Sequence, residues 1–423
     1  MRNLLLLATA IIAVSTALAT AVQAQSRVTI ISQWSAGAEG AAINAVGELV
    51  EKNGAKWEHS PVAGFTTDMM NKLRADIIAG RPPAASQLKG PEIREWSKIS
   101  PALNLDQLVA AANFAAVIPP DLAALHKPRG NWIALPMQVY RVNTMFASKK
   151  ALDRIGATEM PKTWDEFNAM ADKMKAAGIA TPLMHGGTRS NDTMYFELVL
   201  ATMNPDAYRR AIMQLDDKAL RGPEVLAALQ QLRRMTGWMS SSNAGQHFSV
   251  FLPAVMKGEY GFFFNGGWAS GVLKRGGFEE GRDYLCGTMP TNSGKPVFDL
   301  NADGVIFWET KDPGLSAGQK VLANTVMSKE FSTVFSQING SLPARTDMTV
   351  DGAGFQPCQR DAAANLAAAQ AANQVVLSLG HNMAQTNPVT SALTDVLTEF
   401  VHDKSVTPEK AQQRLADAAD SVR

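Results

Sequence analysis

The sequence KGEYGFFFNGGWASG, residues 257–271, contains a strand signal, a turn signal and a Trp in close succession. The mostly aromatic residues 260–264 are typical of a buried strand. Asn265, Gly266 and Gly267 tolerate the positive φ of a tight turn, and small residues after Trp268 suit a helix start. The stretch therefore predicts a Trp at the carboxyl edge of a sheet, where α/β proteins bind ligands. On this stretch alone, Trp268 either faces a ligand or closes a core.

Length and composition indicate a two-domain globular protein. The chain has 423 residues, which is too long for a single hydrophobic core. Charged residues make up 19% and hydrophobic residues 46%. The formal net charge is +1 and there is no long basic run, so we expect no nucleic-acid partner.

The N-terminus predicts export. Arg2 precedes an apolar run over residues 4–12, and Val22-Gln23-Ala24 fits the small-x-small pattern of a cleavage site. We therefore expect a signal peptide at residues 1–24 and a mature chain that is not inserted in the membrane. A transmembrane anchor is the alternative, but the strongly apolar part is too short for one.

The chain has two cysteines, Cys286 and Cys358. In an oxidising compartment a lone pair favours one disulfide over two buried thiols. Neither cysteine lies in a CxxC motif or beside a His, so we expect no metal site, and nothing in the sequence calls for a cofactor.

Strand and helix patterns alternate along the first part of the chain. The expected strands are 27–32, 57–62 and 84–88, and the expected helices are 41–51, 66–79 and a segment ending at Trp96. This alternation predicts βαβ units and a mainly parallel sheet. Further on, Pro136 marks an edge strand or a bend, and Thr163 with Glu166 forms a capping box at a helix start.

Short polar or aromatic clusters occur where the expected strands end. They are Trp34 with Glu39, Gln87 with Lys89, Tyr140 with Arg141, Trp268, Asn301 with Asp303, and His381. A sugar site needs such a mixture, because a Trp face packs on the C–H side of a pyranose while charged and amide groups pair its hydroxyls. Their joint occurrence predicts a carbohydrate site.

Several segments resemble those of a known family in their local sequence and in their order along the chain. They are SQWSAGAEGAAI (32–43), SQLKGP (86–91), WIALPMQVYRVN (132–143), TWDEF (163–167), PLMHGG (182–187), NGGWASG (265–271), DYLCG (283–287), NADG (301–304), NGSLPAR (339–345), GHNMA (380–384) and TEF (398–400). Together they resemble the periplasmic sugar-binding proteins of bacterial ABC importers, in the glucose/mannose-binding group of extracellular solute-binding protein family 1.

The resemblance implies an α/β fold, namely a two-lobed periplasmic-binding-protein clamshell of type II with the ligand in the interlobe cleft. Lobe 1 would comprise residues 25–140 and 304–339, and lobe 2 residues 141–303 and 340–423. Hinge crossings would fall near 140–143, 301–304 and 339–343. Closure around a small carbohydrate would create the shape that a membrane permease recognises. We expect a monomer in the periplasm.

The resemblance also implies roles for individual residues. Trp34 and Trp268 would stack on the sugar, Glu39 and Asp303 would accept from hydroxyls, and Lys89 and His381 would donate. Gln87, Tyr140, Asn301 and Asn339 complete the predicted ligand-binding set. In the family the pair equivalent to Cys286 and Cys358 forms a disulfide in or beside the second lobe.

Five positions depart from the family pattern, one of them near Ser190, where relatives carry another Trp. Gln33, Tyr140, Gly267 and Asn339 stand where relatives carry Trp, His, Asp and Lys. Ring surface and a cation are lost together, which predicts a sugar or sugar derivative other than unmodified glucose.

Two other functions stay open. An extracytoplasmic glycoside-processing enzyme would use a carboxylate pair such as Glu39 and Asp303, although we expect their Lys and His neighbours to keep both ionised. The second alternative is the same clamshell fold binding a polyol, an amino acid or another small metabolite. An amino-acid receptor would need an Arg clamp, for which Arg141 and Arg345 are the candidates.

Overall fold

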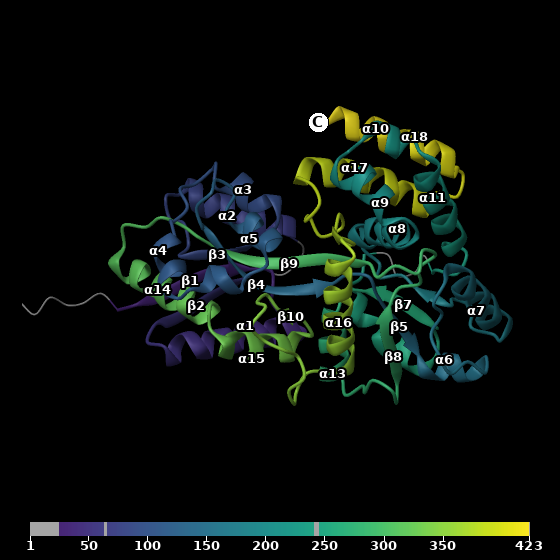
Figure 1. Cartoon of the computed structure of the whole chain (residues 1–423), viewed down its shortest axis with the longest axis horizontal. Coiled ribbons are helices and arrows are strands. Elements are labelled where there is room, and N and C mark those ends of the chain that lie inside the picture. The colour runs from purple at the N-terminus through teal and green to yellow at the C-terminus, as the bar shows by residue number, and fades with distance from the viewer. Residues whose placement is uncertain (1–24, 63–65, 241–244, 423) are drawn as a thin grey trace, which may run out of the picture.

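The computed structural model describes residues 25–62, 66–240 and 245–422, so the predicted signal peptide lies outside the described residues. Two sheets, each with its own helices, form two lobes that lie side by side (Figure 1). We call the part built on the seven-stranded sheet the first lobe and the part built on the four-stranded sheet the second lobe. The two-lobed α/β architecture predicted from the sequence is confirmed.

The first lobe contains a sheet of order β10-β4-β9-β3-β1-β2, with β11 paired to β9. Its strands are β1 (Arg27–Ser32), β2 (Lys56–Pro61), β3 (Ala85–Leu88), β4 (Ala134–Arg141), β9 (Phe298–Phe307), β10 (Leu342–Pro343) and β11 (Val375–Leu377). Its helices are α1 (Gly37–Lys52), α2 (Thr66–Ile78), α3 (Pro91–Trp96), α4 (Asp106–Ala111), α5 (Pro120–His126), α14 (Pro313–Val326) and α15 (Lys329–Asn339), with a 3₁₀ turn at Phe114–Val117.

The second lobe contains a sheet of order β6-β7-β5-β8. The strands are β5 (Thr144–Ser148), β6 (Leu183–Met184), β7 (Phe262–Asn265) and β8 (Tyr284–Thr288). The helices are α6 (Lys149–Arg154), α7 (Trp164–Ala176), α8 (Arg189–Met203), α9 (Pro205–Tyr208), α10 (Asp217–Leu220), α11 (Pro223–Met235), α12 (Leu252–Lys257), α13 (Trp268–Arg275), α17 (Asn387–His402) and α18 (Pro408–Ser421), with a π turn at Arg209–Met213 and a 3₁₀ turn at Phe248–Val250.

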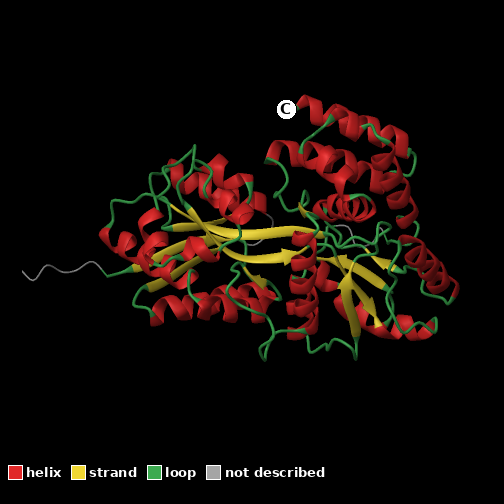
Figure 2. Ribbon diagram, in the orientation of Figure 1, coloured by secondary structure: helices red, strands yellow, loops and turns green. Residues whose placement is uncertain are grey.

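Strands β4 and β9 run from the first sheet toward the second lobe (Figure 2). They pair antiparallel, with Gln138 opposite Asp303 and Tyr140 opposite Asn301. Because side chains alternate along a strand, these four residues share one face of the ribbon. Polar groups of two strands are thereby collected between the lobes.

The parallel pairing predicted from the first part of the chain is confirmed there, but the sheet as a whole is mixed. β1 pairs parallel with β2 and β3, as expected for βαβ units, but β9 pairs antiparallel with both β3 and β4. Pro136 lies at a register shift between β4 and β9, an irregularity of the kind at which strands bend. It is not on an edge strand, because β4 lies between β10 and β9.

Helix α16 (Pro357–Ala371) stands between the lobes (Figure 1). Its Ala362 and Ala369 pack in the hydrophobic core of the first lobe, and its Cys358 packs beside β7 and β8. Cys358 forms a disulfide with Cys286 of β8, with their Cα atoms 5.6 Å apart. The predicted disulfide is confirmed, and it fixes an element that touches both lobes.

The predicted lobe boundaries and hinge crossings stay a prediction. The chain leaves the first sheet at the end of β4, enters it again along β9, and passes from α15 into β10, which pairs with β4. Among the described residues, none of the helices combines the length and the apolar character that a membrane crossing requires.

Candidate functional site

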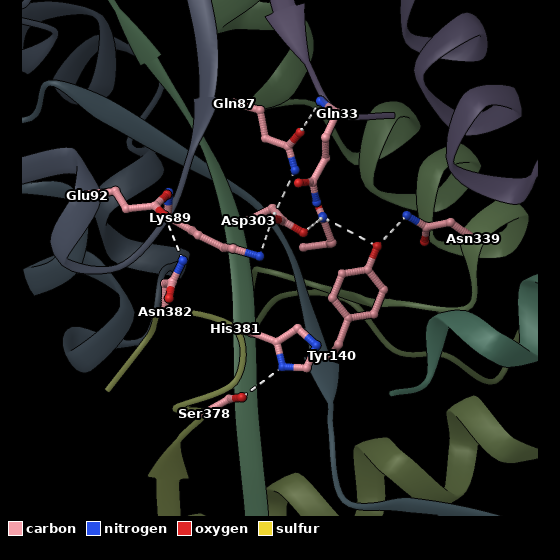
Figure 3. Close-up of polar contacts among 11 residues, drawn as sticks. Gln33, Gln87, Lys89, Glu92, Tyr140, Asp303, Asn339, Ser378, His381 and Asn382 are labelled. Atoms are coloured by element: carbon pink, nitrogen blue, oxygen red, sulfur yellow. Dashed lines mark hydrogen bonds and ion pairs between the residues drawn. The ribbon is translucent and has the colours of Figure 1, made fainter. Parts of the chain in front are cut away.

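Asp303 lies at the centre of a buried polar cluster on the β4–β9 ribbon. It is 3% exposed, and the Gln87 and Gln138 side-chain amides donate to its two oxygens at 3.1 and 2.8 Å. The ammonium of Lys89 lies 3.7 Å from Oδ1 (Figure 3). A carboxylate has about four acceptor positions, so Asp303 retains capacity for a ligand hydroxyl.

The end of β3 supplies the first-lobe side of this cluster. Gln87 and Lys89 are both buried, and the Gln87 carbonyl accepts from the backbone N–H of Gln33 at 3.1 Å. Gln33 follows β1, so a single side chain links two neighbouring strand ends to Asp303 (Figure 3). The structure thus brings together Gln87, Lys89 and Asp303, as the sequence predicted.

Trp268 begins α13 directly after the turn that follows β7. A Cβ on Gly266 would lie 2.0 Å from the indole ring, so a glycine is needed there to let the ring lie over the turn. The ring is partly exposed and meets two others edge-on, Tyr140 with centroids 5.2 Å apart and His381 at 4.9 Å. The strand–turn–helix unit predicted from residues 257–271 is confirmed, and its Trp contacts two other predicted site residues.

His381 lies in the loop after β11, with Nδ1 2.8 Å from the Ser378 hydroxyl (Figure 3). Burial, with the nearby charge of Lys89, lowers the pKa of His381 to about 3. The imidazole is therefore neutral at physiological pH and adds no cation to the site.

Glu39 lies in the first turn of α1 and is partly buried. Burial and the repulsion of Asp303 together outweigh the attraction of Lys89 and raise the pKa of Glu39 to about 7. The expectation that its neighbours keep it ionised is therefore wrong, because desolvation exceeds the effect of a single lysine.

Asn339 ends α15 and is completely buried. Its amide nitrogen donates to the Tyr140 hydroxyl at 2.6 Å, and its carbonyl accepts from the Ser341 backbone at 3.1 Å. Asn339 thus positions the Tyr140 ring instead of presenting free polar groups. Asn301 is also buried, and its side-chain oxygen has no hydrogen-bond partner among the described residues.

Trp34 differs most from its predicted role. Its side chain is only 1% exposed, and the ring packs on Phe335 with centroids 5.3 Å apart. It borders a cavity of about 260 Å³, which is lined by the loop before α1, His59 and Arg275. In this conformation Trp34 is a core residue at a cavity edge and offers no open ring face.

Residues that sequence reasoning missed join α3 of the first lobe to the loop between β11 and α17. Glu92 of α3 accepts from the Asn382 amide at 3.2 Å and from the Lys89 backbone at 3.3 Å. Gly90 has φ +50°, and a Cβ there would lie 2.7 Å from the Asn382 carbonyl oxygen. The segments SQLKGP and GHNMA that carried the resemblance contain Gly90 and Asn382, which was the available signal.

Gln138 was also missed. It lies in the segment ALPMQVYR among Met and Val neighbours, and an isolated Gln in a strand carries little signal. The two Arg candidates for an amino-acid clamp have protein partners instead, since Arg141 pairs with Asp361 and Arg345 with Asp347. No group of three or more potential ligand side chains among the described residues is placed to hold a metal ion.

Comparison with known proteins decides the family. A family described as "Bacterial extracellular solute-binding protein" matches residues 41–365. The chain belongs to this family. A "Probable sugar-binding periplasmic protein" of Brucella suis biovar 1 (strain 1330) is 32% identical to this solute-binding protein over 402 residues, which are 95% of this chain and 94% of the relative.

Two solved structures share the fold of this solute-binding protein. A chitin oligosaccharide binding protein has a TM-score of 0.79 at 19% identity, over 94% of this chain and 99% of that chain. The bacterial solute receptor AcbH, described as having an exclusive preference for β-D-galactopyranose, has a TM-score of 0.77 at 16% identity, over 94% and 99%. Both are two-lobed relatives in fold, and their ligands belong to those proteins.

Proposed function

We propose that this solute-binding protein captures a small carbohydrate between its lobes in the periplasm and delivers it to the permease of an ABC importer. One observation carries the proposal. The partly exposed Trp268 ring contacts Tyr140 and His381, and a polar cluster with Asp303 and Lys89 is centred on the β4–β9 ribbon, which also carries Tyr140. A ring face and charged hydroxyl partners are the two halves of a sugar site. The printed name of the Brucella relative supports the ligand class and the compartment.

We propose a monosaccharide or a small sugar derivative as the ligand. The Glu92–Asn382 contact brings the lobes together beside the cluster, which favours a compact ligand over a long chain. Among the structural neighbours, one is named for an oligosaccharide and another for β-D-galactopyranose, so the shared fold accommodates both sizes.

The preferred ligand would differ from unmodified glucose. Lys89 is the one cation that the described residues place on Asp303, and Asn339, which stands where relatives carry Lys, uses its amide on Tyr140 and Ser341. A hydroxyl that loses a charged partner forfeits about 1.5–3 kcal/mol. Gly267 supplies no side chain to replace that partner.

Binding without catalysis fits the carboxylates best. Asp303 already accepts two amide donors and lies beside Lys89, so it is poorly suited to attack a sugar carbon. Glu39, with its raised pKa, would suit a general acid, and this observation keeps a glycoside-processing enzyme as the second candidate.

A ligand screen tests the proposal. Thermal-shift measurements would cover neutral sugars, amino sugars, sugar acids, polyols and amino acids, followed by isothermal titration of each compound that stabilises the protein. We expect a carbohydrate to give the tightest binding, without being consumed. Preferred binding of an amino acid or polyol, or release of product from a glycoside, would contradict the proposal. Micromolar binding of plain glucose with no better ligand would contradict the specificity alone.

A further inference from the structure

Glu197 of α8 holds the loop that carries His381. It is completely buried, and Oε2 accepts from the backbone N–H groups of Leu379 and, at 2.8 Å, of Gly380. The other oxygen, Oε1, accepts from the Ser378 hydroxyl at 2.7 Å. One carboxylate of the second lobe thus holds three consecutive residues of this loop.

Ser378 links Glu197 to His381. Its Oγ lies 2.7 Å from Glu197 Oε1 and 2.8 Å from His381 Nδ1. A hydroxyl has one hydrogen, so when Ser378 donates to an ionised Glu197 it must accept from Nδ1–H of His381. A neutral imidazole carries one N–H, so Nε2 is then a bare acceptor. Nε2 lies on the side of the ring away from Ser378, toward Tyr140 (Figure 3).

We propose that Glu197, acting through Ser378, sets the tautomer of His381 and so decides whether Nε2 accepts from or donates to the ligand. The proposal rests on the proposed function only in taking the interlobe cleft as the ligand site. With Glu197 ionised, His381 meets a ligand hydroxyl or ammonium as an acceptor. This polarity is opposite to the donor role that the family resemblance implied. Glu197 and Ser378 are positioning residues.

Protonation of Glu197 reverses the chain of hydrogen bonds. One proton enters at Nε2, the Nδ1 proton passes to Ser378 Oγ, and the Ser378 proton passes to Glu197 Oε1. The number of protons on His381 is unchanged, and Nε2 becomes a donor. The proton lies on Oε1 because Oε2 already accepts the two backbone N–H groups.

The groups around the Glu197–Ser378–His381 chain indicate that the change of tautomer occurs near neutral pH. Burial raises the pKa of Glu197 to about 7 against the effect of its hydrogen bonds. The Tyr208 hydroxyl lies 3.4 Å from Oε2, and Asp299, buried and with its pKa raised well above the usual value, also faces Glu197. On the cleft side, His381 faces the charge of Lys89 and the rings of Trp268 and Tyr140.

Glu197→Gln is the decisive variant. The Gln carbonyl can accept from the Leu379 and Gly380 backbones, and its NH₂ group can donate to Ser378 Oγ, as the protonated acid would. Protein labelled with ¹⁵N-histidine gives separate resonances for protonated and bare ring nitrogens. The chain has six histidines, and His381→Asn identifies the resonances of residue 381. We expect a bare Nε2 in the wild type well above pH 7 and a protonated Nε2 in Glu197→Gln at every pH.

Two further variants separate the Glu197–Ser378–His381 chain from structural effects. Ser378→Ala removes the link, so the tautomer of His381 should no longer change with pH. Glu280→Gln alters a partly buried carboxylate that accepts from the Cys358 backbone N–H, and it should behave as the wild type. A wild-type tautomer that is the same above and below pH 7 overturns the proposal, and so does a pH-dependent tautomer in Ser378→Ala. These spectra need no ligand, so failure of the carbohydrate screen leaves them interpretable.

Discussion

At the scale of single residues, Trp268 is where ring contact and polar contact meet. Its partly exposed ring should contribute more to ligand binding than to folding. We expect Trp268→Ala to lose about 1.5–3 kcal/mol of binding free energy, roughly 10- to 100-fold in Kd, measured by titration. Trp164→Ala is the matched control, because Trp164 is 2% exposed in the core of the second lobe and its truncation should cost about 3–5 kcal/mol of folding stability. If Trp268→Ala unfolds like that control and keeps its affinity, Trp268 is a core residue.

Glu39 carries a pH-dependent cost to stability. Folded Glu39 holds its proton up to about pH 7, whereas the ordinary pKa is 4.5, so the folded state loses stability as pH rises between these values. Glu39→Gln removes this loss. We expect the variant to be more stable than the wild type at pH 8, by up to about 3 kcal/mol, and equally stable at pH 4. Urea unfolding at both pH values measures the difference, and an equal shift at both would show that the ionisation of Glu39 is not its cause.

At the scale of elements, the loop between β11 and α17 meets α3 through the hydrogen bond that the Asn382 amide donates to Glu92. Asn382 has φ 57°, so Asn382→Gly removes the amide while keeping a permitted backbone conformation. Burial raises the pKa of Glu92 to about 7, so the range for an ordinary hydrogen bond, about 0.5–1.5 kcal/mol, applies, and we expect ligand affinity to fall by a comparable amount.

Asn373→Gly is the control for this change. Asn373 also has a positive φ, 53°, in the turn before β11, and its backbone carbonyl accepts from Arg209. Its substitution should leave affinity unchanged. Equal affinities for the two glycine variants would mean that the Glu92–Asn382 contact does not stabilise the bound state.

The disulfide between β8 and α16 should stabilise the fold. It joins cysteines 72 residues apart in the sequence, and its loss typically costs about 2–5 kcal/mol. We expect a double Cys→Ser variant at 286 and 358 to unfold at lower urea concentration than the oxidised protein. An unchanged midpoint would show that packing of α16 alone is sufficient.

Local sequence patterns predicted most helices and strands, but they did not predict which strands pair over long distances in the sequence. The capping box at Thr163 and Glu166 is present with both of its hydrogen bonds, because every group involved lies within one helical turn. The antiparallel pairing of β9 with β3 and β4 was not predicted, because the residues of β9 do not indicate its partner strands. The burial of Trp34 likewise depends on Phe335, a residue far away in the chain.

The site shows the same division. Lys89 and Trp268 follow the ends of β3 and β7, where sequence reasoning expects ligands, whereas Asp303 lies in the middle of β9 and still meets Lys89. Trp268 contacts two other predicted site residues, Tyr140 and His381. Gln138 escaped prediction because its role depends on lying opposite Asp303, which only the β4–β9 register defines. The raised pKa of Glu39 follows mainly from burial, which cannot be read from the sequence.

At the scale of the whole molecule, the β4–β9 ribbon, the disulfide-bound α16 and the Glu92–Asn382 contact join two lobes around one polar cluster. The central claim is that a carbohydrate binds between these lobes. A crystal structure with the tightest carbohydrate from the ligand screen tests it most directly. We expect the sugar to contact Trp268 from the second lobe and Asp303 and Lys89 from the first lobe. A sugar bound outside the cleft, or bound without contact to Trp268 and Asp303, would contradict this account.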